Sequence, residues 1–169
     1  MKKGACPTMT ENGIPTILVV DDEEMVLNSM KAFFAIESNY KVLTYTSASK
    51  AMEDLKRNNL KVDLVISDYL MPEMDGITFL AKVKEMLPMV PRILLTGYAD
   101  KENAIQAINS VGLYQYIQKP WDNDDLKLAI RNGLEKTTLL YKLDEKIREV
   151  ERAQRELKDI QKDILRVFA

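Results

Sequence analysis

The stretch that decides the fold is Thr16-Ile17-Leu18-Val19-Val20-Asp21-Asp22, a continuous apolar run that ends in two carboxylates. A short run of β-branched and aliphatic residues, without polar alternation, is typical of a strand buried on both faces, as in parallel sheets. Four similar runs follow, at residues 41–45, 62–67, 92–96 and 114–118. Each of the five runs predicts a strand.

The segments between these runs carry apolar residues at helical spacing. The four sets are Met25, Leu27, Met30, Phe33 and Phe34; Ala51, Met52 and Leu55; Ile77, Leu80, Val83 and Met86; and Ala104, Ile105, Ala107 and Ile108. Ser47 is placed to cap the second of these helices. Strands that alternate with helices predict an α/β fold: a flavodoxin-like, doubly wound sheet of five parallel strands in the order 2-1-3-4-5.

The composition narrows the function classes. Of 169 residues, 46% are hydrophobic and 30% charged, which is typical of a globular protein with a core. A net charge of -2 without a basic block does not indicate nucleic-acid binding. No apolar run reaches membrane-spanning length and no signal peptide begins the chain, so we expect a cytoplasmic protein without membrane contacts. Residues 1–13, which include the single cysteine Cys6, are expected to form a flexible leader.

The chain contains no histidine. This absence excludes serine–histidine and cysteine–histidine nucleophile pairs, histidine general bases and histidine-ligated zinc. Any chemistry must therefore depend on carboxylates, lysine and hydroxyl groups, with or without a hard metal ion.

Chemically active side chains stand at the ends of four predicted strands: Asp21 and Asp22, Asp68, Thr96 and Lys119. In a doubly wound sheet, ligands bind outside the carboxyl ends of the strands. Three converging carboxylates repel one another unless a cation intervenes, and Mg²⁺ suits carboxylates together with a phosphate oxygen. Lys119 and Thr96 can supply a positive charge and a hydroxyl donor to a phosphoryl group. A helix cap or a Lys-Pro turn explains any one of these residues, but not all five together.

Four segments together resemble the signatures of the response-regulator receiver domain (CheY-like) of two-component systems, over residues 14–135. They are Val19-Val20-Asp21-Asp22-Glu23, Ser67-Asp68-Tyr69-Leu70-Met71-Pro72-Glu73-Met74-Asp75-Gly76, Leu95-Thr96-Gly97 and Gln118-Lys119-Pro120-Trp121. The resemblance implies a phosphorylation-dependent switch. Asp68 would accept a phosphoryl group from a sensor histidine kinase or a phosphotransfer protein in a phosphorelay.

The resemblance also implies how the site is built. Asp22, Asp68 and the backbone carbonyl of Leu70 would bind Mg²⁺, with Asp21 acting largely through a metal-bound water. Thr96 and Lys119 would contact the phosphoryl oxygens. Three further residues match loop positions of the family: Pro72, Gly76 and Pro120. At Gly76 the backbone geometry is expected to require glycine, and at Pro120 a cis peptide is expected.

Two aromatic residues and one leucine match variable or mobile positions beside this site. Tyr116 matches the aromatic switch residue that moves with Thr96, although an ordinary edge-strand tyrosine is the alternative. Leu70 and Tyr98 are bulky and lack a group that could orient water. We therefore hypothesise that they shield the acyl phosphate and slow its hydrolysis.

Residues 136–169 predict a coiled-coil linker helix that leads to an output domain outside this chain. Apolar residues recur at three- and four-residue spacing, at Leu140, Leu143, Ile147, Val150, Leu157 and Ile164. One register places Gln154 and Gln161 in the core; a shift by three residues recruits Ala153, Ile160 and Val167 instead. We expect a homodimer through this helix, the alternative being that its stripe folds back onto the receiver or fits another domain.

Two other functions remain open at this stage. One is a constitutive coiled-coil interaction module that ignores phosphate. The other is an aspartate-nucleophile phosphohydrolase, although Leu70 stands where such enzymes usually carry a second acidic residue. In the leading interpretation the chain is a stoichiometric phosphoacceptor and not an enzyme, while its output domain could be one, such as a cyclic-dinucleotide phosphodiesterase. No helix-turn-helix is found in these residues, so nucleic-acid contacts are not expected within the chain.

Overall fold

Five parallel strands form one sheet in the predicted order, β2-β1-β3-β4-β5. The computed structural model describes residues 13–37, 39–57, 60–97, 105 and 111–168. The strands are β1 (Thr16–Val20), β2 (Lys41–Tyr45), β3 (Leu64–Asp68), β4 (Arg92–Thr96) and β5 (Gln115–Gln118). Every residue of the three inner strands is buried, whereas the two edge strands are partly exposed. This burial explains why β1, β3 and β4 are nearly continuous apolar runs.

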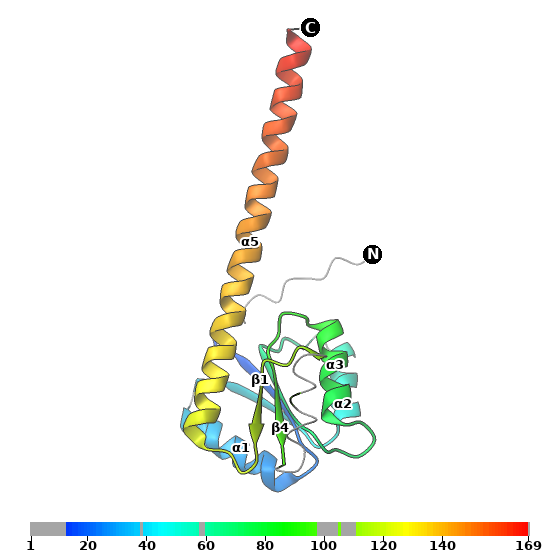
Figure 1. The fold of residues 1–169 in the computed structure, drawn as a ribbon, viewed down its shortest axis with the longest axis vertical. Helices are drawn as coiled ribbons and strands as arrows, with labels where there is room; N and C mark the ends of the chain where they lie inside the picture. Colours follow the sequence, from blue (N-terminus) through cyan, green and yellow to red (C-terminus); the bar gives the residue numbers. More distant parts are fainter. Residues whose placement is uncertain (1–12, 38, 58–59, 98–104, 106–110, 169) are drawn as a thin grey trace.

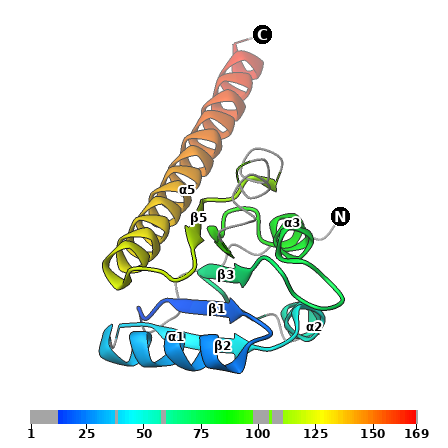
Figure 2. The same cartoon turned by 60° about the horizontal axis from the view of Figure 1, so that its bottom comes forward.

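Helices cover both faces of the sheet (Figures 1 and 2). They are α1 (Glu24–Glu37), α2 (Ala48–Arg57), α3 (Gly76–Met86) and α5 (Asn123–Val167). Side chains of α1 and α5 pack in one hydrophobic cluster with alternate residues of the inner strands, such as Ile17, Val19 and Ile66. Side chains of α2 and α3 pack with the other set, such as Leu18 and Val65. The doubly wound α/β prediction is confirmed.

Most of the predicted helical faces are buried, with one correction. Ser47 caps α2, since its Oγ accepts a hydrogen bond from the Lys50 backbone amide at 3.3 Å. Met25, in contrast, is 82% exposed, while Leu27 is buried. Successive helical residues are rotated by about 100°, so two residues only two positions apart lie on nearly opposite sides of α1. Assigning both to the core face was therefore wrong.

Some predictions fall partly or wholly outside the described residues. Of the helix expected around residues 104–108, only Ile105 is described; it is helical and exposed. The leader at residues 1–12, with Cys6, and the position of Tyr98 also lie outside the described part of the chain.

The last helix, α5, has two parts with different surroundings. Its first part packs on the sheet through Leu126, Ala129, Ile130, Gly133 and Thr137, all buried. Every described residue from position 145 onward is exposed, and this second part projects away from the domain (Figure 1). The projecting stripe is thus not folded back onto the described sheet and its helices. Among the described residues, no helix combines the length and apolarity needed to cross a bilayer.

Candidate functional site

Three carboxylates gather at the carboxyl edge of the sheet. Asp21 directly follows β1, Asp22 comes next, and Asp68 is the last residue of β3. Asp21 is fully buried and Asp68 nearly so, whereas Asp22 is exposed. One ligand oxygen from each can be chosen so that all three lie within 4.8 Å of one another. The structure therefore brings together the three aspartates that the sequence singled out.

Lys119 reaches into this cluster from the residue after β5. Its Nζ lies 2.7 Å from Asp21 Oδ2 and 2.6 Å from Asp68 Oδ1. Its backbone amide also donates to the Thr96 carbonyl at 2.7 Å, which ties it to the end of β4. Burial lowers the pKa of the Lys119 ammonium, but its hydrogen bonds to the two carboxylates outweigh burial, so that the pKa is raised overall. The side chain is therefore a fixed positive charge at this site.

The Asp68 carboxylate is less well compensated than Lys119. Burial raises the pKa of Asp68; Lys119 counteracts this effect, while the nearby Asp21 carboxylate adds to it, and the pKa is raised overall. Both pKa values reflect the same arrangement of charges. Two carboxylates stabilise the charged form of Lys119, whereas the Asp68 carboxylate shares this one cation with Asp21. One ammonium faces three carboxylates, so the site is short of positive charge.

Thr96 ends β4, the strand beside β3 in the sheet. Its side chain is fully buried, yet its Oγ1 has no hydrogen-bond partner among the described residues. A buried hydroxyl without a partner costs free energy, and a ligand that accepts a hydrogen bond would remove this cost. A phosphoryl oxygen bound at Asp68 would be such an acceptor.

The loop between β3 and α3 packs closely against the backbone carbonyl of Asp68. A Cβ on Gly76 would overlap the Asp68 backbone carbonyl oxygen and lie 3.0 Å from Leu94 Cδ1. The Gly76 amide donates to the Tyr69 carbonyl at 2.8 Å, which closes the loop. The sequence singled out Gly76 for backbone freedom, but the physical reason is close approach, since the space contains no room for a side chain.

The remaining predicted residues lie in this loop, in β5 or directly after β5. The Pro72 carbonyl accepts a hydrogen bond from the Met74 backbone amide at 2.7 Å. Glu73, between them, has a positive φ of 67°. Leu70 is 63% exposed. The Lys119–Pro120 peptide bond is cis. Tyr116 is half-buried and packs against the cluster formed with α2 and α3. Its role as a switch, like the metal-binding role of the Leu70 carbonyl, stays a prediction.

The donor set fits a hard divalent cation. Three carboxylates supply only oxygen ligands, and a second positive charge would relieve the repulsion that Lys119 leaves. One carboxylate, Asp22, is exposed, so a cation could keep several waters, as Mg²⁺ prefers. The residues present thus fit the predicted metal.

Sequence reasoning missed two residues that fix the position of α5, one at its start beside this site and one farther along the helix. Asp122 is the N-cap of α5, and its side chain accepts from the amides of Asp124 and Asp125 at 2.8 and 3.2 Å. An acidic residue three positions after the cap, here Asp125, was the available signal. Thr137 donates from Oγ1 to the Gly133 carbonyl at 3.0 Å and to the Met89 carbonyl at 3.3 Å, which ties α5 to the loop before β4. Nothing in the sequence pattern marked Thr137.

Comparison with known proteins agrees with this geometry. The chain is 36% identical over 136 residues to the hydrogenase transcriptional regulatory protein HoxA of Cupriavidus necator, covering 79% of this chain and 27% of that protein. A response regulator receiver domain protein from Clostridium thermocellum superposes with a TM-score of 0.70 at 35% identity, covering 75% of this chain and 98% of the other. The signal receiver domain of an HD domain-containing protein from Pseudomonas fluorescens Pf-5 gives 0.68 at 38% identity, covering 73% and 97%.

The chain spans about a quarter of the length of the curated relatives it matches. The family model of the response regulator receiver domain matches residues 17–131, which include all five residues that the sequence placed at the strand ends. This chain therefore belongs to the response-regulator receiver family.

Proposed function

We propose that the chain is a phosphorylation-dependent switch in which Asp68 is the phosphoacceptor. The observation that carries this proposal is the pairing of Asp68 with Lys119 at 2.6 Å, beside the buried and unpartnered hydroxyl of Thr96. A nucleophilic carboxylate, a cation and a hydroxyl donor are the groups that a transferred phosphoryl group requires.

The reaction is a single transfer. A carboxylate oxygen of Asp68 forms a bond to phosphorus as the bond between phosphorus and the donor nitrogen breaks, and the electron pair leaves with the imidazole of the donor phosphohistidine. Lys119 and Thr96 bind oxygens of the transferred group. Asp22, Asp68 and the Leu70 carbonyl would hold Mg²⁺, with Asp21 acting largely through a metal-bound water, and the ion would supply the positive charge that the phosphoryl oxygens and three carboxylates require.

The transfer is stoichiometric, so the chain acts as a phosphoacceptor and not as a turnover enzyme. Its donor is a sensor histidine kinase or a phosphotransfer protein. Leu70 and Tyr98 slow hydrolysis of the acyl phosphate by limiting access of water. A phosphate lifetime of only seconds with Mg²⁺ present would contradict this shielding role.

The signal leaves the site through α5. Lys119 is three residues before Asp122, the N-cap of α5, so a change in what Lys119 binds acts on the start of this helix. Drawing Thr96 toward a phosphoryl group also vacates space beside it, into which Tyr116 moves. Residues 14–135 form the receiver and residues 136–169 the linker helix, which leads to an output domain. The names of HoxA and of the HD domain-containing protein indicate different outputs. We therefore propose a route for the signal only as far as α5 and assign no output to this chain.

The exposed stripe of α5 pairs with a second copy of the chain. Leu143, Ile147 and Val150 are 58%, 48% and 56% exposed, and none of them belongs to a hydrophobic core among the described residues. Sedimentation equilibrium tests this part, and a monomer at high concentration would contradict it.

Incubation with Mg²⁺ and a small phosphodonor separates the proposal from its alternatives. A stable adduct of one phosphoryl group supports the switch. Continuous release of phosphate over many turnovers would support a phosphohydrolase, and the absence of any adduct would support a constitutive coiled-coil module. The Asp68→Asn variant serves as the negative control.

A further inference from the structure

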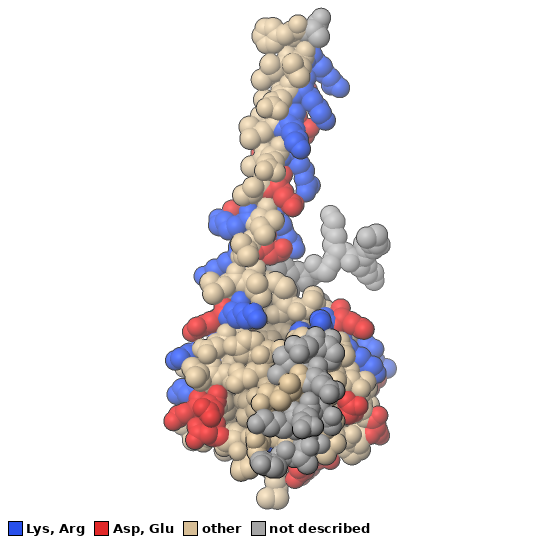
Figure 3. Space-filling view, viewed as in Figure 1, with Lys and Arg blue, Asp and Glu red and all other residues tan. Residues whose placement is uncertain are grey.

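The projecting part of α5 carries an uncharged band along one side and basic residues along another (Figure 3). Ten large apolar side chains from position 139 to the end of the described helix are 36% exposed or more. They are Leu139, Leu140, Leu143, Ile147, Val150, Leu157, Ile160, Ile164, Leu165 and Val167. An exposed band of this length on a single helix indicates a helical partner.

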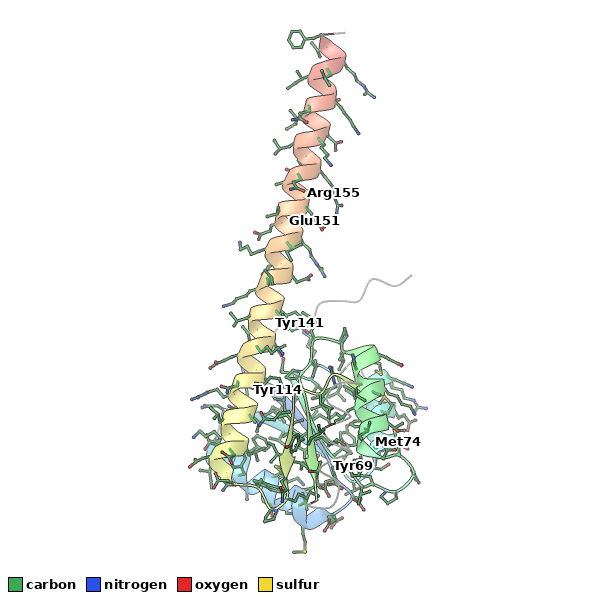
Figure 4. All side chains as sticks on the ribbon, viewed as in Figure 1. Tyr69, Met74, Tyr114, Tyr141, Glu151 and Arg155 are labelled. Atoms are coloured by element: carbon green, nitrogen blue, oxygen red, sulfur yellow. The ribbon has the colours of Figure 1, made fainter. Side chains whose placement is uncertain are left out.

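Charge favours a second copy of this chain as that partner, in parallel orientation. With Leu140 and Ile147 at heptad position a, Lys146 occupies g and Glu151 the following e, the positions that face each other across a parallel pair. Two-fold symmetry then creates this attractive pair twice. In the single chain Lys146 binds Glu149 at 2.7 Å on its own helix and is largely exposed, so it is free to exchange partners. Glu151 and Arg155, which pair at 3.4 Å, lie on the projecting part (Figure 4).

Beyond Val150 the same register continues with polar core positions. Gln154 and Gln161 fall at a, which weakens the core but leaves the supercoil undisturbed. Ile160 at g then faces Leu165 at the e position of the partner, so apolar contact at the flank offsets part of the loss.

A shift of three residues gives a second register with an apolar core. Ala153, Ile160 and Val167 replace the glutamines, and Leu157 and Ile164 belong to the core in both registers. The glutamines move to e positions, where Gln154 and Gln161 face Glu149 and Glu156 of the partner and can donate hydrogen bonds to them. The shift requires local overwinding of the supercoil near Val150, and it exposes Leu165.

Each register therefore has stabilising contacts that the other lacks. The first has a regular supercoil and the apolar contact between Ile160 and Leu165. The second has an apolar core and hydrogen bonds between the glutamines and the partner's glutamates. The two differ by a rotation of about 50° of each helix, half of the rotation between successive residues. We propose that residues 151–167 of a parallel α5 dimer adopt either register, and that phosphorylation of Asp68 selects between them.

This inference rests on the proposed function. Two contacts of α5 with the domain would allow the helix to transmit a rotation. Its N-cap, Asp122, is three residues from Lys119, which binds Asp68. A second anchor lies at Gly133, where a Cβ would come within 3.3 Å of Leu64 Cδ1 and 3.4 Å of Pro91 Cβ. Because the helix touches the sheet so closely there, a displaced N-cap turns or tilts α5 about this point instead of lifting it away.

Cysteine crosslinking of the full chain distinguishes the two registers. Cys6→Ser removes the only native cysteine, and single cysteines then replace Gln154 or Gln161 for the first register and Ala153 or Ile160 for the second. Ile164→Cys is the positive control for both registers, and Asp159→Cys, on the far side of the helix, is the negative control. All six positions are exposed in the single chain, so the domain fold does not depend on them. Disulfide yield is measured with and without Mg²⁺ and beryllofluoride, which mimics a phosphoryl group.

The expected result is a change of about threefold or more in the yield ratio between positions 153 and 154, matched at 160 and 161. The change should disappear in the Asp68→Asn background. A yield ratio unchanged by the mimic would overturn the register switch but leave the phosphoacceptor and the dimer in place. Crosslinking at Ile164→Cys no greater than at Asp159→Cys would overturn the pairing itself.

Failure of the proposed function is seen separately. Trp121, the only tryptophan, lies two residues after Lys119, so its fluorescence reports binding of the mimic. No fluorescence change with Mg²⁺ and beryllofluoride, together with no adduct from a phosphodonor, would contradict the phosphoacceptor role and, with it, the selection of register by phosphorylation.

Discussion

The Nζ atom of Lys119 lies 2.6 Å from Oδ1 of Asp68, although the two residues come from opposite sides of β4 in the sheet. The contact spans the carboxyl end of β4, where the Thr96 hydroxyl is buried without a partner among the described residues. The three groups that would bind a phosphoryl group are therefore held by two adjacent strands and the loop after a third. The rigid inner strands fix their spacing before any ligand arrives.

Magnesium should stabilise the folded chain. A ligand that binds only the folded state adds about 2.7 kcal/mol to the free energy of unfolding at one hundred times its dissociation constant. We expect the melting temperature to rise with Mg²⁺ concentration, as measured by differential scanning calorimetry. Asp22→Asn should reduce this rise while leaving the metal-free protein folded, because Asp22 is exposed. An equal rise in both proteins would place the ion elsewhere.

Thr96→Val should separate stability from switching. Valine keeps the shape of threonine but removes the unpartnered hydroxyl, so we expect the free energy of unfolding to increase by about 1 kcal/mol. The fluorescence response of Trp121 to beryllofluoride should weaken, because one donor to the mimic is lost. Urea unfolding and a fluorescence titration measure the two effects.

The matched control for this variant is Thr137→Val. The Thr137 hydroxyl donates to the Gly133 and Met89 carbonyls, so its removal should lower the free energy of unfolding. A loss of stability at both positions would show that Thr96 has a partner in the folded protein.

Gly76→Ala should be strongly destabilising. The new methyl group would overlap the Asp68 carbonyl oxygen, which belongs to an inner strand and cannot move freely. Overpacking of this kind costs about 3 kcal/mol. Gly13→Ala is the control: its φ is +72° but its Cβ would meet nothing within 4 Å, so only backbone strain of about 1 kcal/mol is expected. Similar losses in both variants, measured by urea unfolding, would argue against the close approach at Gly76.

Asp68→Asn should change the pH dependence of stability in metal-free buffer. Burial first, and then Asp21, raise the pKa of Asp68 in the folded state against the opposing effect of Lys119, so the folded protein binds the proton more tightly than the unfolded chain does. Wild-type stability therefore falls as pH rises from the ordinary carboxyl pKa through the raised one.

At neutral pH the asparagine variant should consequently be the more stable protein, because it avoids this charge. The difference should shrink as pH falls and the wild-type carboxyl group takes up its proton. Urea unfolding of both proteins across this range provides the comparison. A difference that grows toward acid pH would mean that Lys119 outweighs burial at this site.

Much of the fold was readable from the sequence because the inner strands are buried on both faces. Short apolar runs rich in β-branched residues, such as residues 17–20, are typical of buried parallel strands, and parallel strands that alternate with helices allow few topologies. Met25 was misassigned because a residue at the exposed start of α1 can be as apolar as one in the core. Hydrophobicity alone does not specify the side of a helix that a terminal residue occupies.

The site was readable for a related reason. Asp21, Asp68 and Thr96 follow or end strands that the topology makes neighbours, so their convergence follows from the strand order. The unpartnered Thr96 hydroxyl, the overlap at Gly76 and the link from Thr137 to Met89 could not be predicted, since each depends on distances between segments remote in sequence. Such contacts are determined by tertiary packing and not by the pattern of residues along the sequence.

The most direct test of the phosphoacceptor role locates the adduct. The full chain is incubated with Mg²⁺ and a small phosphodonor, the acyl phosphate is trapped by borohydride reduction, and the modified residue is identified by peptide mass spectrometry. We predict one modification, at Asp68, that is lost with a chelator and in Asp68→Asn. Modification of another residue in the wild-type chain, or an adduct that persists in Asp68→Asn and without Mg²⁺, would contradict the assignment of Asp68 as the phosphoacceptor.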